Sequence, residues 1–168
     1  MACAISGCAT SSSLSEAKPL PAGVVAYKSF GIRMKPGAKE DEGGKYSGKF
    51  AQHLASKLNE QKVFAQVILD PNAPADLVVT LNFTRIDRPG GASSVLGGGM
   101  ANAEVELDGV FTRGTSPDPV GSFHLTGNSK NRGRTSIGGF GVTSSEDYTQ
   151  TAIEEAAEKL AELIASRR

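Results

Sequence analysis

The chain has 168 residues, of which 39% are hydrophobic, and its 18 basic residues balance 18 acidic ones. This length fits a single domain, and the zero net charge is not that of a nucleic-acid-binding protein or of a polybasic membrane-surface segment. No stretch approaches the roughly 20 apolar residues of a transmembrane helix, so any membrane attachment is expected to be covalent or through a partner.

The only two cysteines, Cys3 and Cys8, lie ahead of the first predicted element. Cys8 ends the tetrapeptide "ISGC", an aliphatic residue and two small residues before a cysteine, which is where a bacterial lipoprotein signal peptidase cleaves. A zinc site is not supported, because no other Cys and no nearby His completes four ligands. We interpret residues 1–8 as the remnant of a lipoprotein signal and Cys8 as the lipidation site. The alternative is that both cysteines are incidental residues of a frayed terminus.

Only seven residues precede Cys8, and none of them is Lys or Arg. A secretory signal needs a positively charged region and about 7–15 apolar residues. We therefore expect the signal to begin upstream of this sequence. Residues 9–22 are rich in Ser, Ala and Pro and show no apolar periodicity, so they are predicted to form a flexible tether. A single periplasmic domain is expected over residues 23–168.

The first half of this domain is predicted to contain three strands and a helix. The β-branched segment 23–32 reads as a strand, and residues 46–61 carry one apolar stripe on a helix of about four turns. Residues 63–70 form a second predicted strand that ends at the Asp70-Pro71 turn. Residues 75–87 alternate apolar and polar side chains, as a half-buried strand does.

The second half contains two strands, two glycine-rich segments and a helix. Residues 102–112 and 120–128 alternate in the same manner and are predicted to be strands. The last 25 residues, from Ser144, have the pattern of a helix: Ser144 or Ser145 caps it, acidic residues fill the first turn and one stripe is apolar. The glycine-rich segments 88–100 and 130–142 lack the Lys-Ser/Thr ending of a phosphate-binding loop.

The order β-α-β-β-β-β-α predicts an α+β two-layer sandwich, in which two helices cover one face of a mixed sheet of about five strands. The other face is expected to be polar, with Glu104, Glu106, Asp108 and His124 on neighbouring strands. One interpretation is a solvated sheet face. The alternative is a small hydrolase or metal-dependent enzyme that uses these four residues. We favour no enzymatic activity, and no catalytic residue, metal or cofactor is assigned.

The glycine-rich segments are expected at one end of the sheet, where they carry a few apolar side chains. Three of these, Leu96, Met100 and Phe140, are candidate contacts for a partner protein or a neighbouring copy, since small exposed apolar clusters mark interfaces. The alternative is that both segments are mobile linkers.

The "ISGC" tetrapeptide, the strand "ADLVVTLNFTRID", the segment "GGASSVLGGGMANAEVELDGVF" and the final Ala-rich helix together resemble a family of uncharacterised bacterial lipoproteins. The layout is also similar to the periplasmic domain of the curli-secretion channel lipoprotein and to the amino-terminal domain of the Tol-system periplasmic protein. The resemblance implies a role in protein binding or envelope assembly, with an envelope protein or a second copy as partner. Because Ala9 rather than Asp follows Cys8, it also implies a lipid anchor on the periplasmic face of the outer membrane.

Overall fold

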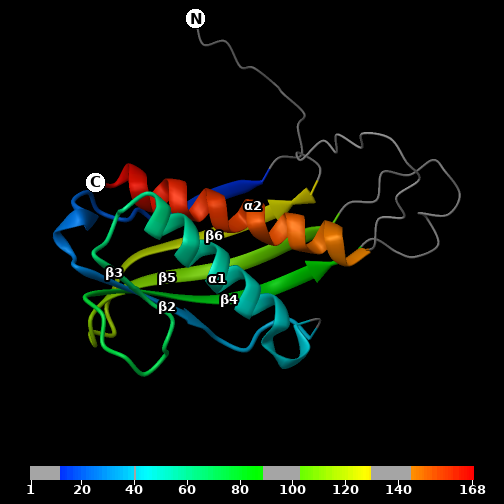
Figure 1. The fold of residues 1–168 in the computed structure, drawn as a ribbon, viewed down its shortest axis with the longest axis horizontal. Coiled ribbons are helices and arrows are strands. Elements are labelled where there is room, and N and C mark those ends of the chain that lie inside the picture. Colours follow the sequence, from blue (N-terminus) through cyan, green and yellow to red (C-terminus); the bar gives the residue numbers. More distant parts are fainter. Residues whose placement is uncertain (1–11, 40, 89–102, 130–144) are drawn as a thin grey trace, which may run out of the picture.

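The computed structural model describes residues 12–39, 41–88, 103–129 and 145–168. Six strands and two α-helices form two layers, with α1 and α2 side by side across one face of the sheet (Figure 1). The elements are β1 (Ser13–Lys18), η1 (Val24–Ala26), β2 (Ser29–Met34), η2 (Glu42–Gly44), α1 (Lys45–Glu60), β3 (Gln66–Ile68), β4 (Leu77–Asp87), β5 (Glu104–Arg113), β6 (Pro119–Asn128) and α2 (Ser145–Ser166).

The sheet has the strand order β1-β6-β5-β4-β2-β3. Strand β2 is parallel to both β3 and β4, while β4, β5 and β6 form an antiparallel meander. The predicted α+β sandwich with two helices on one face is confirmed. The sheet has six strands rather than about five.

The sixth strand is β1, which corrects the prediction that residues 9–22 form a flexible tether. β1 pairs antiparallel with β6, and Leu14 lies opposite the fully buried Leu125. The Ser12 hydroxyl accepts a hydrogen bond from the Asn128 N–H and donates one to Glu155 of α2. A serine-rich segment without apolar periodicity is therefore held by backbone pairing and by polar contacts at its ends.

Two further strand predictions were wrong in their limits. Residues 23–32 are not one strand: Gly23 has a φ of 87°, a left-handed conformation that suits glycine, and it starts the short helix η1. Gly23 and Val24 both donate their N–H to the Arg167 carbonyl, so this turn docks on the end of α2. Strand β3 covers three residues, whereas residues 63–70 were predicted as a strand.

The core lies between the helices and the inner face of the sheet. The predicted inward residues of β4 and β5 are all buried, and so is the apolar stripe of α2 apart from the half-buried Leu163. Leu81 and Leu160 have no exposed surface. A Cβ on Gly127 of β6 would lie 2.2 Å from the Ala152 carbonyl oxygen, so the absence of a side chain there lets α2 lie directly on the sheet.

Asp76 holds the start of β2 against the start of β4. Its carboxylate accepts hydrogen bonds from the N–H groups of Lys28 (3.0 Å) and Ser29 (2.9 Å) and from the Ser29 hydroxyl (3.0 Å). These bonds favour the charged form of the carboxyl and lower the pKa of Asp76 below its ordinary value of 3.8. The hydrogen bond from the Ser29 N–H contributes most to this shift.

We expect Asp76→Asn to lower the melting temperature at neutral pH. A carboxyl whose pKa is lower in the folded than in the unfolded state stabilises the fold above its unfolded pKa, and this stabilisation is lost as pH falls through the folded pKa. The difference between wild type and Asp76→Asn should therefore shrink as pH falls below the ordinary aspartate pKa of 3.8. Thermal denaturation followed by circular dichroism measures it, with Asp118→Asn in an exposed turn as control. An equal difference at neutral and at acidic pH would contradict this role of Asp76.

Candidate interaction surfaces

The face of the sheet opposite the helices is polar. Because side chains alternate along a strand, it carries every second residue of the meander. Asp108 of β5 is paired in register with His124 of β6, and Glu106 with Thr126. The prediction that Glu104, Glu106, Asp108 and His124 share this outer face is confirmed. No described helix or strand covers it, and the segment before β4 covers only one end of it, where Val78 is buried and Ala75 lies against Gly31.

An arginine that the sequence analysis did not single out organises the acidic residues of this face. Arg85 Nη1 lies 3.3 Å from Glu106 Oε1 and 4.0 Å from Glu104 Oε1, and Arg85 Nη2 contacts the carboxylate of Asp87. The carboxylates of Asp87 and Glu106 raise the pKa of the Arg85 guanidinium, and the hydrogen bond to Asp87 contributes most to this shift. The two glutamates are thus paired within the sheet, and such exposed pairs contribute little to stability.

His124 contacts a different carboxylate. Its Nδ1 lies 2.8 Å from Asp108 Oδ1, and both side chains are about half exposed. The four predicted residues therefore separate into a His124–Asp108 pair and two glutamates bound to Arg85. Within the described ranges, no three His, Cys, Asp or Glu side chains come together as metal ligands.

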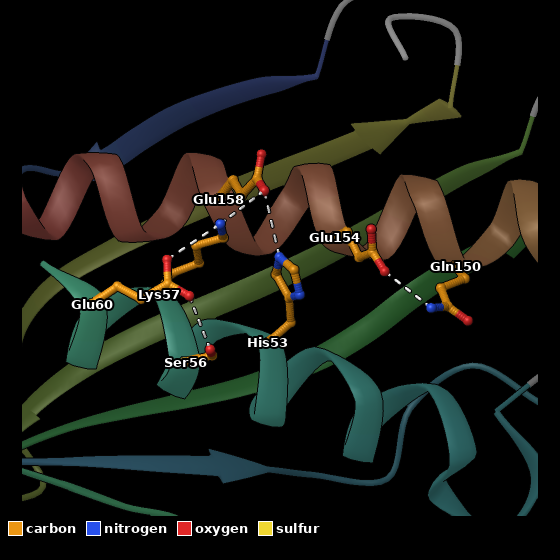
Figure 2. A network of polar contacts seen from close by, with 7 residues as sticks. All are labelled: His53, Ser56, Lys57, Glu60, Gln150, Glu154 and Glu158. Atoms are coloured by element: carbon orange, nitrogen blue, oxygen red, sulfur yellow. Dashed lines mark hydrogen bonds and ion pairs between the residues drawn. The ribbon is translucent and has the colours of Figure 1, made fainter. Parts of the chain in front are cut away.

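A second polar surface lies where α1 and α2 meet (Figure 2). His53 Nε2 and Lys57 Nζ of α1 each lie 3.5 Å from Glu158 Oε1 of α2, and Gln150 donates to Glu154 along α2. A small cavity of about 300 Å³ opens beside these residues. His53 is half-buried in this seam. We interpret the seam as a contact that fixes one helix beside the other.

A third surface is a groove between α1 and the edge of the sheet, with a volume of about 790 Å³. Its walls come from β2, the segment after it, the first half of α1 and the turn after β3; they are Ile32, Arg33, Met34, Lys35, Pro36, Gly37, Ala38, Lys39, Asp41, Gly43, Gly44, Ser47, Gly48, Ala51, Gln52, Leu69 and Pro71. The sequence alone did not indicate this groove.

Local contacts hold that segment against the sheet and the helix. A Cβ on Gly37 would lie 2.2 Å from the Phe83 carbonyl oxygen, and the Ala38 N–H donates to the same oxygen. Asp41 accepts hydrogen bonds from the N–H groups of Tyr46 (2.7 Å) and Ser47 (3.3 Å), so its carboxylate caps α1. The glycines of "RMKPGAKEDEGGK" were the available signal, because glycine permits close backbone approach.

The residues predicted as lipidation site and contacts, Cys8, Leu96, Met100 and Phe140, lie outside the described residues. The structure does describe the elements that flank the two glycine-rich segments, which are β4, β5, β6 and α2. Asp87 is paired with Glu104, and Glu104 with Asn128, so β4 ends where β5 begins and β6 ends. β1 and α2 begin at this same end of the sheet (Figure 1). The strands that precede the two glycine-rich segments therefore end together, whereas the predicted position of the segments themselves lies outside the described residues.

No family model matches the sequence, and no curated protein matches it. Solved structures do match. A PelC dodecamer from Paraburkholderia phytofirmans is 12% identical, over 89% of this chain and 96% of that chain, with a TM-score of 0.56. A Xanthomonas campestris protein of the family-model DUF330 is also 12% identical, over 89% of this chain and 86% of that one, with a TM-score of 0.53.

These likenesses show the fold and not the function, because the identities are low. The chain shares the fold of PelC and of the DUF330 protein, whereas the likeness to the curli-secretion lipoprotein stays a prediction. In the part of the chain that the structure describes, no helix is both long and apolar enough to span a membrane.

Proposed function

We propose that the protein is a lipid-anchored component of the bacterial envelope, on the periplasmic face of the outer membrane, that binds other protein chains, copies of itself among them. The observation that carries the proposal is the uncovered sheet. The described elements cover one face only, and the strands at both ends of the strand order, β1 and β3, each have one neighbour. The edge strands present backbone N–H and C=O groups with which another chain can pair.

The anchor would be attached at Cys8. Residues 9–12 separate this cysteine from β1, and four residues span at most about 14 Å when fully extended. A lipid on Cys8 would therefore hold the end of the sheet where β1 begins close to the bilayer. β3 lies at the opposite edge of the sheet from β1, the strand next to the anchor.

Self-association is supported by the shared fold and by the surface. PelC, whose fold this chain shares, is a dodecamer in its crystals. Val110, at the centre of the outer sheet face, is 38% exposed, which makes it one of two large hydrophobic side chains that are exposed among the described residues. An apolar side chain surrounded by polar residues is the usual composition of a protein interface.

We further propose that the protein has no enzymatic activity. The residues of the alternative hypothesis separate on an open sheet face, where Glu104 and Glu106 are bound to Arg85 and Asp108 is bound to His124. Catalytic sites are concave and bring several polar groups together on one substrate.

Two copies with different tags, both lipidated and produced in the same cells, test the association. After cross-linking in intact cells, we expect recovery of one tag to bring down the other. An unrelated outer-membrane lipoprotein with the same tag serves as the control for crowding in the membrane. Recovery of the tagged chain alone, with no second copy and no other protein, would contradict a protein-binding role.

A further inference from the structure

The groove beside α1 contains a free strand edge. β2 is paired with β4 as far as Met34, but its pairing with β3 ends at Gly31, opposite Ile68. Leu69 and then Asp70-Pro71 follow Ile68, and proline has no N–H with which to continue a strand. Along residues 32–34, no described strand therefore occupies the side of β2 that faces away from β4.

The backbone on this side is available for hydrogen bonds. The Lys35 N–H donates to the Leu81 carbonyl of β4. Because successive N–H groups of a strand point to opposite sides, the Met34 N–H points into the groove instead. Extended peptides bind proteins by adding a strand to an edge of this kind.

The two walls of the groove differ in character. Ile32 and Met34 face the helix layer, where they contribute to the core, and the small residues Gly48 and Ala51 of α1 stand opposite. A Cβ on Gly48 would have no atom within 4 Å, so the space above this helix turn is open. Leu69, 43% exposed, lines the same groove. This wall fits aliphatic side chains.

The other wall is basic. Arg33 and Lys35 alternate with Ile32 and Met34 along the chain and so lie toward the outer face of the sheet. Lys39 adds a third positive charge, while the single described acidic residue of the lining, Asp41, is bound to the start of α1. An added strand would thus place every second side chain beside cationic groups.

We propose that this groove binds an extended segment of a partner protein in which aliphatic and acidic residues alternate, added to β2 as a further strand. The aliphatic side chains lie against Ile32, Ala51 and Leu69, and the carboxylates lie beside Arg33 and Lys35. The inference rests on the proposed protein-binding function and names the class of partner segment for it. The volume of about 790 Å³ is in the range of sites that enclose a ligand.

The test uses the purified full chain and a fluorescein-labelled ten-residue peptide in which valine alternates with glutamate. We expect saturable binding, seen as fluorescence anisotropy, below about 1 mM peptide. Amide hydrogen exchange at Met34 should slow when the peptide is bound. A peptide with lysine in place of glutamate should bind at least about tenfold more weakly, because it meets three cations.

Gly48→Leu is the decisive variant, because the leucine side chain fills the groove without a clash. The helix should tolerate the change, because leucine favours a helix interior more than glycine does. We expect it to weaken binding at least about tenfold. Asn59→Leu, which adds the same side chain at an exposed position of α1, is the matched control and should bind normally. Arg33→Gln with Lys35→Gln provides a second variant if Gly48→Leu alters the circular dichroism spectrum.

Absence of saturable binding, equal binding of the lysine peptide, or binding that neither variant weakens would overturn the inference. Association of two tagged copies in cells does not depend on this peptide. If the copies associate and the peptide does not bind, the groove proposal alone fails. If the peptide does not bind and the cross-linked chain is also recovered without a second copy or any other protein, the proposed function fails as well.

Discussion

Leu160→Asp unfolds the domain, or leaves it folded only at low temperature. Leu160 is fully buried in the hydrophobic core, and aspartate there places a carboxylate among buried apolar side chains. Unpaired buried charge costs about 3–5 kcal/mol, a large part of the roughly 5–15 kcal/mol by which domains are stable. Leu81→Asp, in the middle of β4, should have an effect of similar size. Urea denaturation followed by circular dichroism measures both.

His124→Ala is the matched control, because His124 lies on the outer face of the same sheet. Its side chain is 45% exposed, and we expect a change in unfolding free energy within about 0.5 kcal/mol. Unfolding of the domain by His124→Ala, or an unchanged denaturation midpoint for Leu160→Asp, would show that the two faces of the sheet have been assigned wrongly.

The meander and both helices could be predicted because their patterns are regular. Along β5 and most of β6, buried residues alternate with more exposed ones, so a period of two identifies both the strand and its orientation. Helix α1 likewise buries its apolar stripe, which includes Phe50, Leu54 and Leu58. In such segments each local preference agrees with the tertiary packing, and the pattern alone suffices.

Arg85 shows where this reasoning stops. Strict alternation after Leu81 and Phe83 would place Arg85 in the core, but the pairing with β5 shifts between Phe83 and Arg85. This bulge turns Arg85 outward, where it binds the glutamates of β5, and turns Ile86 inward. A bulge depends on the partner strand, so the alternation within β4 does not reveal it.

β1 and the groove were missed because both depend on contacts between distant segments. β1 is a strand because β6 offers it an edge, and its own residues, such as Ser13 and Ser15, have little preference for strands. The groove exists because the pairing of β2 with β3 ends at Gly31, three residues before its pairing with β4 ends at Met34. The sequence indicated the turn at Asp70-Pro71, but not which strand would be left without a neighbour.

Cys8→Ser is expected to abolish membrane attachment altogether, since the account assigns the anchor to this one side chain. No described helix has the length and apolar character to replace it. The lipid of a processed lipoprotein binds the membrane through its buried methylene groups, each of which contributes about 0.8 kcal/mol. Cys3→Ser is the matched control, because Cys3 lies ahead of the predicted cleavage position.

The measurement that tests the anchored-envelope account most directly is metabolic labelling with a fatty-acid probe, followed by separation of membranes from soluble protein. The chain is produced with a secretion signal placed upstream and "ISGC" kept intact. Wild type and Cys3→Ser should carry the label and sediment with the outer membrane, and Cys8→Ser should be unlabelled and remain soluble. Wild-type protein that is unlabelled and soluble would contradict the account.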